Sequence, residues 1–310
     1  MARPASLTER PYPSGEQIEL ASGDQRVVVV EVGAGIRTYT VGGLPVVDGY
    51  DARELSPSGR GQLLIPWPNR IEDGSYEFDG LRHQLPLDEP ERGNAIHGLV
   101  RWEPWEVVER APSSVVLEYV LYPRPGYPFT LALRVEHALG AEGLEVRSEA
   151  TNIGAQACPY GAGAHPYLAV DSGSVDHLAL QVPAQTVLEA DARGLPTGSR
   201  SVEGGAYDFR SAKEIGGVRL DHCFTDVVRE RDGRARVRLG NGTSLWADES
   251  YGYFMVFTGD GLPDVDRRSI AVEPMTCAPN AFRSGEGLIR LEPSETHVSV
   301  WGIAPAGLGS

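Results

Sequence analysis

The chain has 310 residues, a net charge of −15 and a sequence pI near 4.9. This acidic balance argues against nucleic acid or an anionic membrane as a partner, because both require a basic face. The apolar fraction of 41% and the charged fraction of 23% are typical of a soluble globular protein.

The cysteines and the N-terminal segment indicate the cellular compartment. Three widely spaced cysteines, Cys158, Cys223 and Cys277, match no zinc spacing and no disulfide framework. Residues 1–17 contain Arg, Glu and three prolines but no apolar run, and no stretch reaches the ~18 apolar residues of a membrane-spanning helix. We therefore expect a cytoplasmic protein with an irregular lead-in over residues 1–16.

Short apolar segments recur from residue 18 onward and are separated by turn residues. Several alternate apolar and polar positions, as in 130–136, which is the pattern of strands with one buried face. The 37 glycines and 23 prolines include turn pairs such as Asp79-Gly80 and Asn241-Gly242. The predicted strands include 26–32, 37–41, 105–110, 115–122, 129–138, 144–152, 178–182, 186–190, 224–228, 235–239, 243–247, 253–258, 269–272, 288–292 and 297–303.

These segments predict an all-β protein. No amphipathic helix of about 12 residues or more is recognisable, and neither a linker nor a fixed repeat divides the chain. Many short strands with turns every ~8–12 residues are typical of a sandwich or barrel. We predict one large antiparallel domain over residues 1–310, in which one sheet face packs on another and a free face can form a cleft.

The segment 158–170 sets a single imidazole, His165, between a run of small residues and a Pro-Tyr step. The small residues allow another backbone or a ligand to come close. Pro166 removes a backbone donor and favours an extended conformation at His165. Taken alone, this segment fits a histidine satisfied inside the core as well as it fits a functional one.

Glu273 is the second prominent candidate, because it ends an apolar strand just before a loop interrupted by prolines. Partial desolvation there would raise the pKa of the carboxyl above its ~4.3 reference and make it a better base near neutral pH. The alternative is an exposed glutamate at a strand end.

Polar residues in three other segments also fit a cleft. Asn69 and Arg70 follow two prolines at the mouth of a strand, where Trp67 could offer an apolar platform to a sugar. His97 precedes a glycine, and Asp221 precedes a strand and could accept hydrogen bonds from hydroxyls. Each has a structural alternative: a surface arginine, a satisfied histidine or a turn-capping aspartate.

Other site types are not predicted. His97, His165 and Glu273 come from distant segments without the usual metal-ligand spacing. The segment Gly33-Ala34-Gly35 lacks the third glycine of a dinucleotide loop and reads as a β-turn. Lys213 is the only lysine, which excludes a phosphate loop of the Walker type.

The motifs, in their order and spacing, resemble those of the aldose 1-epimerase (galactose mutarotase) family over about residues 18–303. They are Asn69-Arg70-Ile71, His97-Gly98, His165-Pro166-Tyr167, Asp221-His222 and Val272-Glu273-Pro274. The resemblance implies a β-supersandwich with an open carbohydrate-binding cleft and no cofactor or metal. It also implies an isomerase that interconverts the α and β anomers of an aldose.

The resemblance further implies a role for each residue, with His165 as the general acid and Glu273 as the general base. Ring opening needs both, because the C1 hydroxyl loses a proton while the ring oxygen gains one. A salt-bridge-like Glu273–His165 couple across the sugar is expected to hold His165 charged in the resting state. The residues implied to bind the sugar are Asn69, Arg70, His97, Asp221 and Tyr167. In this setting the small residues before His165 are expected to make room for the sugar.

The chain departs from the best-known family pattern at two places, after His97-Gly98 and in the loop after Glu273. Both departures resemble a less-studied bacterial branch that includes sulfoquinovose mutarotase-like proteins, so they leave the sugar open. One alternative is a non-catalytic carbohydrate-binding or sensor protein on the same fold.

The other alternative is an epimerase for a sugar phosphate or sulfonate, which would need further arginines at the cleft. The candidates are Arg101, Arg267, Arg268 and Arg283. In each case the expected partner is a small monosaccharide, with no nucleic acid and no membrane, and the chain is expected to be a monomer or a homodimer.

Overall fold

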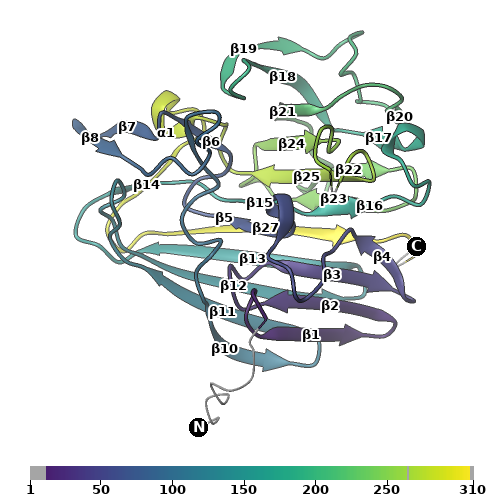
Figure 1. Ribbon diagram of the computed structural model, residues 1–310, viewed down its shortest axis with the longest axis horizontal. Coiled ribbons are helices and arrows are strands. Elements are labelled where there is room, and N and C mark those ends of the chain that lie inside the picture. The colour runs from purple at the N-terminus through teal and green to yellow at the C-terminus, as the bar shows by residue number, and fades with distance from the viewer. Residues whose placement is uncertain (1–11, 264, 308–310) are drawn as a thin grey trace.

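The computed structural model describes residues 12–263 and 265–307, and two large antiparallel sheets make up most of it (Figure 1). The twelve-stranded sheet runs in the order β1-β2-β3-β4-β16-β25-β24-β21-β18-β19, with β15 and β5 attached beside β25. Its strands are β1 (Gln17–Ser22), β2 (Gln25–Val30), β3 (Ile36–Val41), β4 (Leu44–Val47), β5 (Leu63–Leu64), β15 (Gly163–Ala164), β16 (Tyr167–Ala169), β18 (Ala184–Ala190), β19 (Pro196–Ser201), β21 (Asp221–Val227), β24 (Tyr253–Phe257) and β25 (Ser269–Met275).

The second sheet has nine strands in the order β10-β11-β12-β13-β27-β23-β22-β17-β20. They are β10 (Glu106–Ala111), β11 (Ser114–Leu121), β12 (Leu131–Gly140), β13 (Gly143–Asn152), β17 (Ala179–Gln181), β20 (Lys213–Glu214), β22 (Ala235–Leu239), β23 (Ser244–Ala247) and β27 (Thr296–Ala304).

Three strand pairs and three helical turns complete the described residues. The pairs are β6 (Arg70–Glu72) with β9 (Asn94–Ile96), β7 (Ser75–Phe78) with β8 (Leu81–Gln84), and β14 (Cys158–Tyr160) with β26 (Ile289–Leu291). The turns are α1 (Ala281–Ser284), η1 (Pro57–Gly59) and η2 (Val175–His177). Among the described residues, no helix has the length and apolar character needed to cross a membrane.

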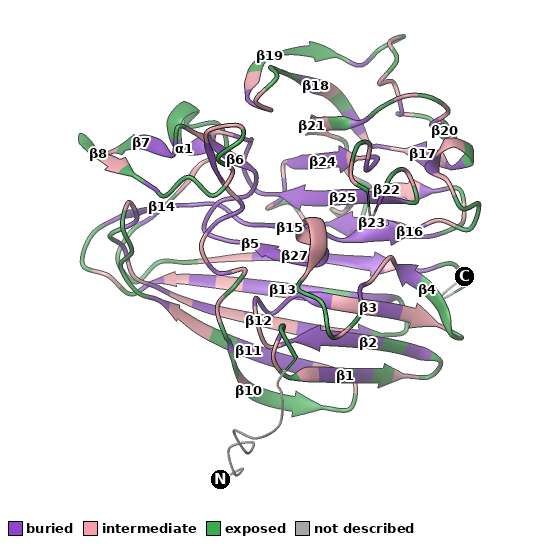
Figure 2. Cartoon of the chain, viewed as in Figure 1, coloured by how far each residue is buried: buried purple, intermediate pink, exposed green. Residues whose placement is uncertain are grey.

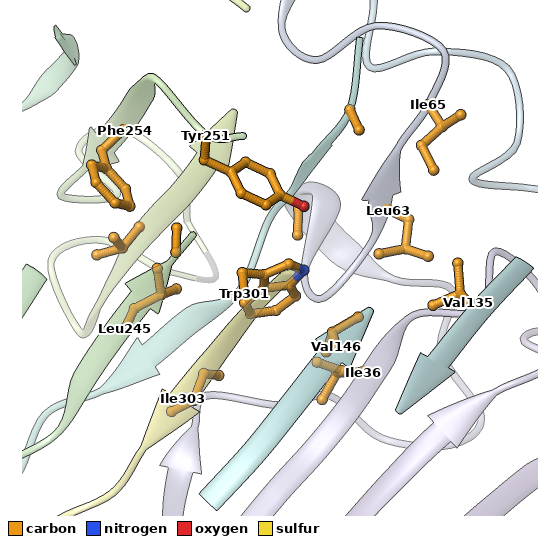
Figure 3. Packing of buried hydrophobic residues seen from close by; sticks show 14 of the residues in the cluster. Ile36, Leu63, Ile65, Val135, Val146, Leu245, Tyr251, Phe254, Trp301 and Ile303 are labelled. Atoms are coloured by element: carbon orange, nitrogen blue, oxygen red, sulfur yellow. The ribbon is translucent and has the colours of Figure 1, made fainter. Parts of the chain in front are cut away.

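The main hydrophobic core draws on both large sheets. Along β12, buried residues such as Leu131, Leu133 and Val135 alternate with less buried ones, as a strand with one core face requires. Figure 3 shows buried side chains from both sheets in this core, among them Ile36 of β3, Val135 of β12 and Trp301 of β27. Each fully buried side chain of this kind contributes roughly 1.5–3 kcal/mol.

The predicted all-β antiparallel class is confirmed, and most predicted strands lie within a residue or two of the observed ones. Of the predicted lead-in, residues 1–11 lie outside the described part, and residues 12–16 contain no strand. The strands absent from the predicted ranges include β1, β4, β7, β8, β19 and β20. Exposed and intermediate residues predominate in β8 and β19, so these strands lack the apolar alternation that identifies a strand.

β25 is the strand that carries Glu273 into the interior. All seven of its residues are buried, which is unusual for a strand with a carboxylate. Ile270 and Val272 belong to the main core, whereas Ala271 packs with a separate cluster on the opposite face. Side chains alternate along a strand, so Glu273 shares the face of Ala271. Met255 of β24 lies directly opposite Glu273 in the register.

The segment 57–62, hereafter the η1 loop, passes between β3 and the His165 backbone. Its Gly61 amide donates to the His165 carbonyl at 2.9 Å, and its Gly61 carbonyl accepts from the Ile36 amide at 2.9 Å. Gly61 has a φ of +67°, and a Cβ there would lie 1.8 Å from the Ile36 carbonyl oxygen. Only glycine fits this position without moving β3.

We expect Gly61→Ala to destabilise the fold by about 2–5 kcal/mol, because the left-handed backbone costs about 1–2 kcal/mol and the clash adds about 1–3 kcal/mol. Gly204→Ala is the matched control, since Gly204 has a φ of +66° and open space around its Cβ position. Denaturant unfolding measures both changes. Equal losses in the two variants would contradict the role given to the close approach.

Candidate active site

A cavity of about 510 Å³ lies where β16, β21, β24 and β25 meet the η1 loop and the loops around β6 and β9. The sequence predicted seven site residues, and all seven line it: Asn69, Arg70, His97, His165, Tyr167, Asp221 and Glu273. Segments as far apart in the chain as Asn69 and Glu273 therefore converge on one cavity, as the sequence predicted for a cleft.

His165 and Glu273 form a buried pair in this cavity. The Nε2 atom of His165 lies 3.4 Å from Oε1 of Glu273. The two residues are only 6% and 3% exposed. Among the described residues, neither Nδ1 of His165 nor Oε2 of Glu273 has a hydrogen-bond partner. Two buried polar groups thus face each other with hydrogen-bonding capacity to spare, which is unusual outside functional sites.

The pKa shifts of the two residues oppose a charged His165 in the absence of sugar. Burial, with smaller contributions from the charges of Arg101, Arg60 and Arg70, lowers the pKa of His165 to about 3. Burial raises the pKa of Glu273 well above its usual range, and the nearby Asp221 carboxylate acts in the same direction. The 3.4 Å separation would suit an ion pair, but desolvation penalises both charges, so the pair shares one proton that resides on Glu273.

His97 is held in one tautomer by the backbone. The Asn69 amide donates to Nδ1 of His97 at 3.2 Å, so the neutral ring carries its proton on Nε2. Burial, together with the positive charges around it, lowers the pKa of His97 well below 6.5. The His97 and His165 rings meet edge to face at a centroid distance of 5.4 Å. His97 therefore presents a neutral N–H donor.

The hydrogen bond from the Asn69 amide to Nδ1 of His97 also disfavours metal binding. Candidate ligand atoms of His97, His165 and Glu273 lie within 4.8 Å of one another. To bind a metal through Nε2, His97 would have to give up the proton there, and Nδ1 would then face the Asn69 N–H without a lone pair to accept it. The donor set fits hydrogen bonding to a hydroxyl better than it fits a cation.

Arg70 is oriented by a partner that the sequence did not reveal. Its Nε and Nη2 atoms donate to the two oxygens of Glu89 at 2.8 Å and 2.9 Å. Asn94 donates to the same carboxylate at 3.0 Å and accepts from Arg193, which lies between β18 and β19. Burial lowers the pKa of Arg70, but the two bonds to Glu89 outweigh it and the pKa rises overall. This fork leaves Arg70 with a fixed direction and a permanent charge.

Asp221 and Tyr167 complete the predicted set. Asp221 is exposed and begins β21, rather than preceding the strand, and pairs in register with Phe257 of β24. Tyr167 is buried and stacks on His165, with ring centroids 5.0 Å apart and planes inclined by 13°. Tyr167 therefore supports the imidazole as well as lining the cavity.

Two expectations about the cavity walls are wrong. Trp67 is buried and packs edge to face on Phe282 at 5.5 Å, so it offers no platform to a ligand. The small residues before His165 make room for protein instead of ligand. A Cβ on Gly161 would lie 2.5 Å from the Cys277 sulfur, and one on Gly163 would lie 2.9 Å from Pro68.

The arginines proposed for an anionic substituent lie elsewhere. Within the described residues, none of the four lines the cavity, and each is within 3.2 Å of a carboxylate oxygen. They are Arg101, Arg267, Arg268 and Arg283. Arg92 does line the cavity, beside Glu89 and Glu91.

Comparison with known proteins supports the same assignment. Residues 16–303 match the model of the aldose 1-epimerase family. The chain belongs to the aldose 1-epimerase family. The uncharacterised protein YihR of Escherichia coli is 38% identical over 288 residues, covering 92% of this chain and 91% of that protein. The E. coli aldose 1-epimerase is 29% identical over 163 residues, covering 50% of this chain and 46% of that protein.

The fold of this aldose 1-epimerase family member is also found in solved structures. The GalM/aldose epimerase homologue from C. elegans superposes with a TM-score of 0.81 at 20% identity, covering 94% of this chain and 99% of that one. This likeness confirms the galactose mutarotase-like sandwich.

We expect the His97 and His165 rings to remain neutral as the pH falls from 7 to 5, because burial lowers both pKa values. Nitrogen NMR of histidine-labelled protein measures this directly, with His97→Gln and His165→Asn assigning the signals. Protonation of either ring with a midpoint near the ordinary imidazole value of about 6.5 would contradict the burial argument.

Proposed function

We propose that this protein is an aldose 1-epimerase, or mutarotase, that interconverts the α and β anomers of an aldopyranose. The observation that carries the proposal is the buried His165–Glu273 pair, 3.4 Å apart, in which Nδ1 of His165 and Oε2 of Glu273 have no hydrogen-bond partner in the described part of the chain. The cavity around it, at about 510 Å³, has ample room for one monosaccharide.

The reaction requires two proton transfers, and the pair supplies both groups. Glu273 accepts the proton of the C1 hydroxyl while His165 donates one to the ring oxygen, and the C1–O5 bond opens to the aldehyde. Rotation about C1–C2 presents the other face of the carbonyl, and the reverse transfers close the ring. No atom is gained or lost, and the pair returns to its starting protonation.

Substrate binding reconciles these roles with the empty cavity. The single proton of the pair resides on Glu273 when the cavity is empty, because burial disfavours both charges. A C1 hydroxyl that donates to Glu273 and a ring oxygen that accepts from His165 stabilise the other arrangement, with the proton on the imidazole. The sugar thus draws the proton to the group that delivers it.

The remaining lining residues suit a neutral, hydroxyl-rich ligand. Arg70 and the Nε2–H of His97 provide donors, and Asp221 provides an acceptor. Besides the protonated Glu273, the charged lining comprises two arginines against four carboxylates: Arg70 and Arg92 against Glu89, Glu91, Asp221 and Asp260. This balance disfavours a phosphate or sulfonate substituent.

We expect His165→Asn and Glu273→Gln each to reduce the acceleration of anomer exchange by ~10²–10⁴-fold, the usual contribution of one proton-transfer group. Polarimetry of freshly dissolved α-D-glucose and α-D-galactose measures the rate. His177→Asn and Glu249→Gln serve as controls, because both residues are exposed and lie outside the cavity lining. Near wild-type acceleration in either site variant would refute the assignment.

An NMR exchange screen separates the alternatives. The panel is glucose, galactose, xylose, arabinose, glucose 6-phosphate and sulfoquinovose. Sugar binding in calorimetry without faster exchange would support a carbohydrate-binding or sensor protein. Faster exchange confined to the phosphate or the sulfonate would overturn the neutral substrate class while leaving the chemistry in place.

The pH dependence of kcat/KM follows from the two pKa shifts. Activity requires one proton on the pair, and the second proton is added only at low pH because the pKa of His165 is lowered to about 3. We therefore expect no loss of kcat/KM as the pH falls through about 6.5, and a decline at higher pH as the raised pKa of Glu273 is passed. An acid limb centred near 6.5 would contradict this account.

A further inference from the structure

We propose that Arg60 is a positioning residue for His165, acting through the ring of Tyr167 and through the η1 loop that carries it. The inference rests on the proposed function, since it concerns the group that delivers the proton. Arg60 does not line the cavity, and its side chain is only 1% exposed.

Three flat groups are layered behind the cavity. The guanidinium carbon of Arg60 lies 5.0 Å from the centre of the Tyr167 ring. That ring is in turn stacked on His165 at 5.0 Å. The Tyr167 hydroxyl donates to the Ser58 carbonyl at 3.2 Å, which ties the middle layer to the η1 loop. The Tyr167 ring therefore contacts both the Arg60 cation and the His165 imidazole.

The η1 loop also holds the backbone and one edge of His165. The His165 amide donates to the Gln62 carbonyl at 3.0 Å, and its carbonyl accepts from the Gly61 amide at 2.9 Å. A Cβ on Gly59 would lie 3.0 Å from Cδ2 of the imidazole, so the loop backbone packs closely against the ring. Movement of this loop therefore moves the ring of His165.

The burial of Arg60 is difficult to explain by packing alone. A buried guanidinium is costly, and an apolar side chain of similar volume often serves stability as well or better. Its carboxylate partner, Asp48, lies at 3.3 Å and is shared with Arg268 and with the hydroxyl of Ser269.

The charge has a chemical effect on His165. The groups that act on the ring come from several parts of the chain: Glu273 of β25, His97 after β9, Tyr167 of β16, and the charges of Arg60, Arg70 and Arg101. Burial is the largest influence, and the three arginines all lower the pKa of His165. A protonated His165 beside this field is a stronger acid and gives its proton to the ring oxygen more readily.

Arg60→Met tests the proposal, with two readouts. We expect the His165 titration, followed by nitrogen NMR from pH 7 to 2, to move up by about 0.5–1 pH unit, the effect of removing one nearby positive charge. We also expect kcat to fall roughly tenfold or more with little change in KM, because the ring is less well placed. Arg60→Lys should restore the titration, since it keeps the charge, but not the full kcat.

Arg268→Met is the matched control, because Arg268 pairs with the same Asp48 carboxylate but is half exposed and lies outside the stack. It should leave the titration and kcat unchanged. An unshifted titration in Arg60→Met, or an equal shift in Arg268→Met, would overturn the proposal.

Two further outcomes are decisive. Arg60→Gln provides a second neutral variant, whose amide can still donate to Asp48. If both neutral variants fail to fold, Arg60 has a purely structural role and the proposal is overturned. The NMR titration needs no turnover, so it tests Arg60 even if the wild-type protein accelerates no anomer exchange, which would refute the proposed function alone.

Discussion

One electrostatic constraint governs this site: a buried imidazole and a buried carboxyl face each other. His165 and Glu273 are both almost fully buried and 3.4 Å apart. Burial penalises either charge, so the pair keeps a single proton between its two members. A ligand with hydroxyls supplies the hydrogen bonds that the pair lacks, and it then determines which member holds the proton.

The fold delivers the two groups by different means. Glu273 lies on a strand buried on both faces, where the register with β24 fixes its position. His165 lies between two short strands, β15 and β16, and the η1 loop and Tyr167 determine its orientation. The position of the Glu273 carboxyl and the position of the His165 imidazole are therefore set by separate parts of the fold. This arrangement suits two groups that exchange acid and base roles during ring opening and closure.

The sequence predicted the sandwich and the residues that line the cavity, but only part of the arrangement around them. His165, Glu273 and their companions could be found because each stands in a distinctive local motif. Glu89 and Arg60 could not, because their effects arise through side-chain contacts with Arg70 and Tyr167 that leave no periodic signal. The roles of Glu89 and Arg60 depend on tertiary contacts between distant segments, which the order of residues in the chain does not reveal.

The errors have one physical origin. Trp67 and the small residues before His165 were assigned to the ligand, whereas the structure uses them to pack protein against protein. His165 was expected to be charged because an acid lies close to it, but proximity fixes a charge only when burial is known. The local sequence shows which side chains are present, but their burial determines what they contact and whether they are charged.

Neutron diffraction from deuterated crystals at pH 7 would test the shared proton most directly. Our account predicts, for the empty cavity, one deuterium on the Glu273 carboxyl and a neutral His165 ring with a deuterium on only one nitrogen. A His165 ring with deuterium on both nitrogens beside a bare Glu273 carboxylate would contradict it.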